Sequence, residues 1–106
     1  MDKVRLDKWL WCMRIYKTRS LATEACNKGR ILVNGQLAKP SKELTGNENI
    51  TVRKLPVIYS YKIKMLVNNR LPAKLVHEYI EDHTSVEELE KLKIKETFFV
   101  VRDKGA

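Results

Sequence analysis

The amino-acid sequence predicts an α+β fold, in which two helices pack on a small twisted sheet and a C-terminal strand–helix–strand extension packs on them. Three observations lead to this expectation. Apolar residues recur with helical spacing through the first 28 residues, and short β-branched runs follow them. Asn34-Gly35 separates two of these runs, and both residues tolerate the positive φ angles of a two-residue hairpin turn. The length of 106 residues allows one small core and excludes a large cofactor-binding domain.

The first predicted helix covers residues 6–16. At 100° per residue its apolar side chains share one broad face, made of Leu6, Trp9, Leu10, Cys12, Met13 and Tyr16. Trp11 and Ile15 lie off this face. They are either covered by a later segment or form a stacking surface for a base, flanked by Lys8 and Arg14.

The second predicted helix begins at Thr18 or Ser20, since both residue types are good N-caps, and ends at Lys28. Gly29 follows, and glycine is favoured just past a helix end. The expected inward face carries Leu21, Ala22, Ala25 and Cys26. Most of these side chains are small, so the two helices are expected to approach closely.

Three strands are expected in the rest of the first half, over residues 30–33, 36–39 and 50–53. The segment 39–42 is predicted to be a basic loop, because Pro40 cannot donate a hydrogen bond to a sheet.

A second set of elements follows Pro56. They are a strand over residues 57–67, a helix from 72 or 73 to 82, a short helix over 85–92 and a strand over 97–101. The strand over 57–67 is a candidate pairing partner for the last strand, and the sequence leaves the strand order open. We therefore expect residues 1–54 to form one domain and residues 55–106 to form the extension.

Positive charge is concentrated in the first half of the chain. The net charge is +8 and the sequence pI is about 9.6. Residues 1–54 carry 12 Lys or Arg and 5 Asp or Glu, whereas residues 55–106 carry 9 and 8. Such an excess indicates a polyanionic partner, whose site is expected in the first half. We see no apolar run of membrane-spanning length and no signal-like start, so we expect a cytoplasmic protein with reduced cysteines and no membrane partner.

The start of the second helix is the strongest candidate for a binding site. Free backbone N–H groups and the positive end of the helix dipole favour a phosphate there. Arg19 can bind phosphate through two parallel hydrogen bonds, while Lys17 acts as a point charge. We expect the RNA-binding residues to be Arg5, Lys8, Arg14, Lys17, Thr18, Arg19, Ser20, Lys28, Arg30, Asn34, Lys39 and Lys42. Such a surface suits structured RNA, where backbone shape is recognised more than base sequence.

Other kinds of site have weak support. Cys12, Cys26, His77 and His83 lack the spacing of a zinc site, so no metal is expected. Asp7 is interpreted as a first-turn carboxylate favoured by the helix dipole, not as an acid or base. Cys12 has no nearby histidine, and no glycine-rich loop could cradle a phosphate. We therefore expect neither an enzyme nor a cofactor.

Several motifs together resemble a known family. They are Arg5-Leu6-Asp7-Lys8-Trp9-Leu10, Thr18-Arg19-Ser20-Leu21-Ala22 and Gly29-Arg30-Ile31-Leu32-Val33-Asn34-Gly35. Their combination, over about residues 4–53, resembles the S4-type (alpha-L) RNA-binding domain. Residues 9–19, together with Asn34-Gly35-Gln36 and Lys39-Pro40-Ser41-Lys42, resemble one branch more closely, the ribosome-associated heat-shock protein 15 family.

This resemblance implies a non-enzymatic protein that docks on rRNA and tRNA of the large ribosomal subunit, with no preference for DNA. It further implies a part in the stress response, in rescue or quality control of stalled subunits that carry a nascent chain. Members of that family often carry a long basic helical tail, whereas residues 55–106 are nearly neutral. No role that depends on such a tail is expected here.

Two alternatives stay open at this point. S4-type domains are also appended to RNA-modifying and tRNA-related enzymes, so the chain could be the RNA-binding accessory of such an enzyme. It could instead be a protein-interaction module that docks through Trp11, Ile15 and the C-terminal strands.

Overall fold

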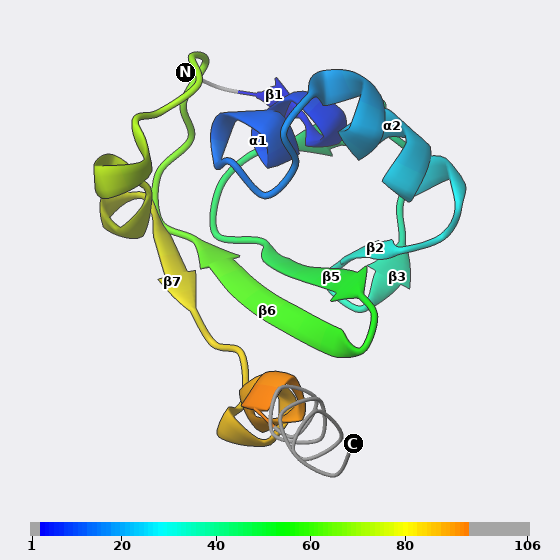
Figure 1. Ribbon diagram of the computed structural model, residues 1–106. Coiled ribbons are helices and arrows are strands. Elements are labelled where there is room, and N and C mark those ends of the chain that lie inside the picture. The colour runs from blue at the N-terminus through cyan, green and yellow to red at the C-terminus, as the bar shows by residue number, and fades with distance from the viewer. Residues whose placement is uncertain (1–2, 94–106) are drawn as a thin grey trace, which may run out of the picture.

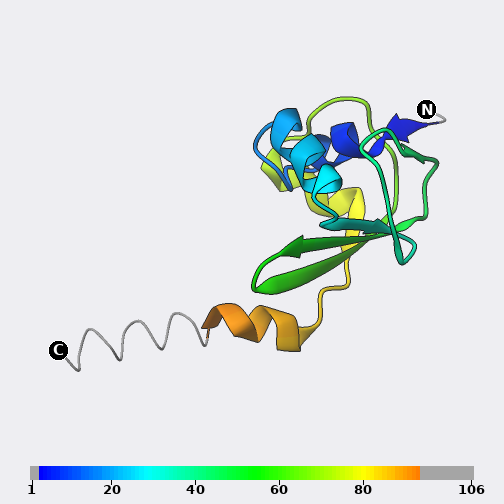
Figure 2. The ribbon, with the colours of Figure 1, turned by 90° about the vertical axis from the view of Figure 1, so that its right-hand side faces the viewer.

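The computed structural model describes residues 3–93, and its helix pair lies over one side of an antiparallel sheet (Figure 1). The elements are β1 (Val4–Arg5), α1 (Leu6–Cys12), α2 (Arg19–Asn27), β2 (Ile31–Val33), β3 (Gln36–Leu37), β4 (Glu43–Leu44), β5 (Asn49–Lys54), β6 (Val57–Ile63), the 3-10 helix η1 (Ala73–Glu78) and β7 (Ile80–Asp82). Residues 86–93 are helical and lie on the side of the sheet away from α1 and α2 (Figure 2). The expected α+β architecture is confirmed.

The main sheet has five strands in the order β3-β2-β5-β6-β7, and every neighbouring pair is antiparallel. Its centre is the long β5–β6 pair, in which Ile50 is opposite Tyr61 and Lys54 is opposite Val57. The strands β1 and β4 form a separate pair with Val4 opposite Leu44. Because β5 and β6 are direct neighbours, the sheet runs without a break from the first half of the chain into the second.

The first helix is shorter than predicted. It ends at Cys12, and Arg14 adopts a left-handed φ of 60°. The backbone N–H groups of Ile15 and Tyr16 both donate to the carbonyl of Leu10, which closes the turn after the helix. The prediction of a helix over 6–16 is therefore wrong, because apolar spacing alone cannot detect a left-handed residue at position 14.

The second helix has the predicted ends. Thr18 is its N-cap, with its hydroxyl accepting a hydrogen bond from the Leu21 amide at 3.1 Å. Gly29 follows the C-cap Lys28 with a φ of 73°. Ala22, Ala25 and Cys26 are buried as expected, but Leu21 is 45% exposed and lies on the outer face, so its predicted inward position is wrong.

The Asn34-Gly35 hairpin is confirmed, with φ angles of 51° and 83° and Val33 paired to Gln36. The Asn34 side chain also accepts a hydrogen bond from the Asn49 amide at 2.9 Å, which ties the turn to β5. The partner strand β3 is only two residues long, although the Ala38 amide still donates to the carbonyl of Ile31 on β2 at 3.3 Å.

The second half differs more from its prediction. β6 ends at Ile63 and not at residue 67. The predicted helix to residue 82 is instead η1 followed by β7, with Ile80 paired to Ile63. Helical and strand patterns both fit so short an apolar run, and pairing with β6 decides in favour of a strand. Strand–helix–strand order is thus provided by β6, η1 and β7, while the predicted strand at 97–101 lies outside the described residues.

One core joins both halves of the chain. Trp9, Leu10 and Ile31 are fully buried, and Leu71 and Ile80 from the second half belong to the same cluster. The Leu71 amide donates to the carbonyl of Cys12 at 3.0 Å, which fixes the second half against the end of α1. Both cysteines are free and buried in this core.

A buried carboxylate stabilises the turn between β4 and β5. Glu48 is 8% exposed and accepts hydrogen bonds from the amides of Thr45 at 2.7 Å and Gly46 at 2.6 Å. The Thr45 hydroxyl donates to the same carboxylate at 3.2 Å. These bonds replace the water that a carboxylate loses on burial.

Candidate nucleic-acid interface

The start of α2 is open to solvent. Lys17, Thr18, Arg19 and Ser20 are all exposed, although the Thr18 hydroxyl is already engaged as the helix cap. The positive end of the α2 dipole therefore faces solvent beside two cationic side chains, an arrangement that attracts phosphate.

Asp7 forms ion pairs with two of the arginines predicted to bind RNA. Its side chain is 3% exposed and lies between Arg5 and Arg19, with N–O distances of 3.1 Å from Arg5 Nη2 to Oδ2 and 3.4 Å from Arg19 Nη2 to Oδ1. Arg5 Nε donates to Oδ1 at 3.2 Å, so the Arg5 contact is bidentate. The Thr23 hydroxyl and the Lys8 amide complete the set at 3.1 and 2.8 Å. Asp7 thus links β1, α1 and α2, a role that the helix-dipole interpretation did not include.

The same contacts set the ionisation of Asp7. Burial acts to raise the pKa of its carboxyl, but hydrogen bonds from Arg5 and Thr23, with the charges of Arg19 and Arg5, bring that pKa below its ordinary value. The bond to Asp7 in turn raises the pKa of Arg5. Arg5 and Arg19 share the one carboxylate of Asp7, so these three side chains together keep a net positive charge. The arginine side chains remain 50% and 45% exposed, which leaves donors available for a phosphate.

The basic loop 39–42 lies beside this cluster. The amide of Leu6 donates to the carbonyl of Lys42 at 2.8 Å, and the amide of Asp7 donates to that of Pro40 at 3.2 Å. The start of α1 is thereby capped by the loop. A shallow hollow between α2 and the hairpin is lined by residues that include Arg5, Thr23 and Lys39. We call Arg5, Lys17, Arg19, Lys39 and Lys42 the cationic cluster.

The other predicted residues lie elsewhere. Lys8 donates to Asn68, and Arg14 lies beyond the end of α1, where its guanidinium donates to the carbonyl of Leu71 at 3.3 Å. Arg14 was predicted to extend the patch along α1. It does not, because α1 ends at Cys12. Lys28 pairs with Glu24 at 2.7 Å at the opposite end of α2, and Arg30 is exposed just after it. Asn34 uses its side chain to hold the hairpin turn.

Two further cations occupy positions that the sequence did not reveal. Arg70 lies 5.7 Å from the Trp11 ring centroid and donates to the Trp11 carbonyl at 3.2 Å, so a later segment covers this ring. Lys54 lies 4.5 Å from the Tyr16 ring centroid and donates to the carbonyl of Ile15. Both pairs join residues far apart in the chain, so no local pattern could have indicated them.

The residues considered for metal binding or nucleophilic chemistry are separated or buried. Within residues 3–93 no group of three or more His, Cys, Asp and Glu side chains is placed to hold a metal ion. Burial raises the pKa of Cys12, and burial together with the charge of Asp7 raises that of Cys26 to about 11. Both are therefore neutral thiols at physiological pH. His83 pairs with Glu81 at 2.8 Å. Among the described helices, none has the length and apolar character required to cross a bilayer.

The chain is similar in sequence to several known proteins. The family model described as the S4 domain matches residues 4–50. Heat shock protein 15 of Escherichia coli K12 is 41% identical over 93 residues, which cover 87% of this chain and 70% of that protein. The RQC P-site tRNA stabilizing factor of Helicobacter pylori J99 is 38% identical over 82 residues, covering 76% of this chain and 98% of that protein.

The likeness extends to three dimensions. The trimeric structure of Vibrio cholerae heat shock protein 15 superimposes with a TM-score of 0.76 at 33% identity, covering 92% of this chain and 96% of that one.

Proposed function

Because the chain belongs to the family of small S4-domain proteins that includes heat shock protein 15, we propose that it binds structured RNA on the ribosome, without catalysing a reaction. The finer proposal is that it docks on rRNA and tRNA of the large subunit in the cytoplasm. There it would act in rescue or quality control of stalled subunits that carry a nascent chain.

The observation that carries this proposal is the cationic cluster around the open start of α2. Asp7 fixes the guanidinium groups of Arg5 and Arg19 before any ligand arrives, so little side-chain freedom is lost on binding. Lys17 adds exposed charge at the helix opening, and loop 39–42, which lines a hollow together with Arg5 and Thr23, adds two lysines. Fixed donors around a helix N-terminus suit an RNA backbone, whose phosphates present several acceptors along a curved path.

The relatives' names support the choice of RNA. One is called a P-site tRNA stabilizing factor, and this name describes binding and no chemical step. We therefore propose that tRNA together with the adjoining ribosomal RNA is the surface that this chain recognises. Shape and phosphate spacing, rather than base sequence, would provide the specificity.

The test measures binding to separated ribosomal subunits and its dependence on salt. We expect the protein to sediment with large subunits, and more strongly when they carry peptidyl-tRNA. The double variant K17Q/R19Q should bind more weakly, and the slope of log K against log salt should become shallower by about 1.5, roughly 0.7–0.9 for each lost phosphate contact.

A matched control removes the same charge elsewhere. Lys91 and Lys93 are in the helical segment 86–93, on the far side of the sheet from α2 (Figure 2). The double variant K91Q/K93Q should therefore leave the salt slope unchanged. Equal loss in both double variants would mean that net charge alone drives binding, which contradicts a defined site. No preference for large subunits, even those loaded with peptidyl-tRNA, would contradict the rescue role.

A further inference from the structure

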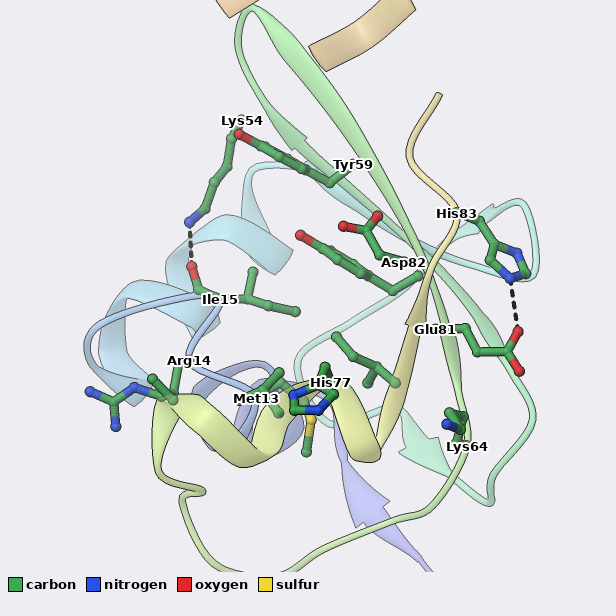
Figure 3. Close-up of a pocket in the computed structure, with 14 residues that line it drawn as sticks. Met13, Arg14, Ile15, Lys54, Tyr59, Lys64, His77, Glu81, Asp82 and His83 are labelled. Atoms are coloured by element: carbon green, nitrogen blue, oxygen red, sulfur yellow. Dashed lines mark hydrogen bonds and ion pairs between the residues drawn. The ribbon is translucent and has the colours of Figure 1, made fainter. Parts of the chain in front are cut away.

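A second concave site lies between the two halves of the chain. It is a pocket of about 870 Å³, bounded by β6, β7 and η1 on one side and by the segment after α1 on the other (Figure 3). Its lining combines aromatic, cationic and carboxylate side chains, and none of these residues belongs to the cationic cluster. This volume falls within the range of small-ligand sites.

Two tyrosines form one wall of the pocket. Tyr59 and Tyr61 are two residues apart on β6, so they project from the same face of the sheet. Their rings are parallel within 4°, with centroids 6.2 Å apart, and both side chains are partly exposed. Burial, with the charges of Asp82 and Tyr59, raises the pKa of Tyr61 to about 12, so its hydroxyl stays protonated. Flat rings that are partly open to solvent are the surfaces on which unpaired bases stack.

A carboxylate lies beside these rings. Asp82 on β7 is opposite Tyr61 in the strand register, and Figure 3 shows it in the middle of the pocket, between Lys54 with Tyr59 at one end and His77 at the other. Its Oδ1 accepts a hydrogen bond from the Thr84 amide at 2.9 Å, which fixes the carboxylate. A carboxylate has about four acceptor positions, so this bond leaves others for a ligand. Glu81 is different, since it pairs with His83.

The pocket borders the segment that leads from α1 to the start of α2. Arg14 and Ile15 line it, and Lys17 to Arg19 at the start of α2 follow directly in the chain. Lys54 lines the pocket and contacts this same segment, because it donates to the carbonyl of Ile15 and lies over the Tyr16 ring. Arg14, Lys54 and Lys64 give the pocket a cationic rim. An RNA backbone held at the start of α2 can therefore turn a neighbouring nucleotide into the pocket.

We propose that this pocket binds one unpaired base of the recognised RNA. The base stacks on the rings of Tyr59 and Tyr61 and donates an exocyclic amino group to Asp82, while its phosphates lie near Lys54 and Arg14. The inference rests on the proposed RNA-binding function and adds the kind of RNA element that is bound, namely a nucleotide outside a duplex. An amino group suits the carboxylate because it donates, whereas the O4 position of uracil only accepts.

The test uses the full chain and two single-stranded RNA hexamers, one of cytidine and one of uridine. These bases are both pyrimidines, and they differ at the position where cytosine carries its amino group. We expect the wild-type protein to bind the cytidine hexamer more tightly. D82N should lose this preference, because an amide can also donate to uracil. Fluorescence anisotropy with labelled hexamers measures both affinities.

A second variant tests stacking. Y59L keeps an apolar side chain but removes the ring, and it should weaken binding about 5- to 100-fold without changing the salt slope. Y79L is the matched control, because Tyr79 is also partly buried in the second half but does not line the pocket. It should bind as the wild type does. If Y59L does not fold, NMR of the unaltered protein decides, since the Tyr59 and Tyr61 ring protons should shift on adding the cytidine hexamer.

The possible failures are distinguishable. If the wild type binds ribosomal RNA through Lys17 and Arg19 but Y59L equals Y79L, the pocket inference is overturned and the proposed function stands. Unmoved tyrosine signals with the cytidine hexamer overturn it as well. If the wild type binds no RNA of any kind, both proposals fall, and binding of an apolar peptide in the same pocket would indicate a protein-docking site instead.

Discussion

Asp7 shows how one buried side chain can prepare a cationic surface. A buried carboxylate would be costly without partners, and here it has two arginines, a threonine hydroxyl and a backbone amide. Each arginine loses part of its freedom to this anion and keeps its remaining donors toward solvent. Asp7 therefore contributes to affinity for a polyanion although its own charge is negative.

The variant D7N tests this role. It should lower the free energy of unfolding by about 1–3 kcal/mol, because charge-assisted hydrogen bonds at a buried position are lost. It should also weaken RNA binding, since Arg5 and Arg19 are no longer held in place. Urea unfolding measures the first effect and subunit sedimentation the second. Stronger RNA binding by D7N would mean that the negative charge matters more than the positioning of the arginines.

The pH dependence of stability provides a separate prediction. The pKa of Asp7 is lower in the folded protein than the ordinary value of about 3.9, so its contribution to stability is complete above that value. It is lost as pH falls through the folded pKa. The difference in unfolding free energy between wild type and D7N should thus shrink between pH 6 and pH 3.

E43Q is the control for this pH series. Glu43 is exposed, and its ion pair with Lys3 is long at 3.9 Å. Its replacement should therefore change stability little at pH 6 or at pH 3. A constant difference between wild type and D7N across the range would contradict the assignment.

At the residue scale, the sequence predicted helix caps but not the contacts between side chains far apart in the chain. Thr18 and Gly29 behave as their chemistry indicates, because caps depend on local geometry. The contacts of Asp7 with Arg19 and Thr23 span 12 and 16 residues, and the contact of Trp11 with Arg70 spans 59. Such pairs depend on the fold and leave no periodic signal in the sequence.

Elements were predictable where one local rule dominated. The hairpin at Asn34 has positive φ angles that few other residue pairs adopt, and the structure contains it as expected. Two failures are at α1 and η1, where apolar spacing continued past the true end of the helix. Arg14 stops α1 through a left-handed φ, and pairing of Ile80 with Ile63 converts the end of a predicted helix into β7.

The turn between β4 and β5 supports a prediction at this scale. E48A should lower the free energy of unfolding by about 2–3 kcal/mol, because the amides of Thr45 and Gly46 lose a charged acceptor and the site is buried. Denaturant unfolding at neutral pH measures the change. E87A, on an exposed position of the helical residues 86–93, should change it little. A loss below about 0.5 kcal/mol for E48A would mean that water replaces the carboxylate without cost.

On the scale of the whole molecule, one sheet and one core link the parts of the chain on either side of residue 54. β5 and β6 are its two longest strands and fall on either side of that division, and Leu71 and Ile80 share the core of Trp9. Composition and charge suggested two parts, whereas the hydrogen-bonded pairing of β5 with β6 links them. Strand order could not be predicted, because it depends on non-local contacts.

We therefore expect residues 3–93 to unfold in one cooperative transition. Tryptophan fluorescence reports on the first half through Trp9 and Trp11, and NMR signals of Tyr59 and Tyr61 report on the second. The two urea transitions should have the same midpoint and slope. An earlier midpoint for the tyrosine signals would show that the second half is an independent unit.

The placement of the two thiols has a practical consequence. Cys12 lies on α1 and Cys26 on α2, which carries Arg19 of the cationic cluster, and both thiols are buried and protonated at neutral pH. A thiol-labelling reagent can therefore modify them only when the helix pair opens, so the labelling rate records how often opening occurs. A ligand that holds the two helices together would lower the labelling rate. The two native cysteines therefore report on ligand binding without any substitution in the chain.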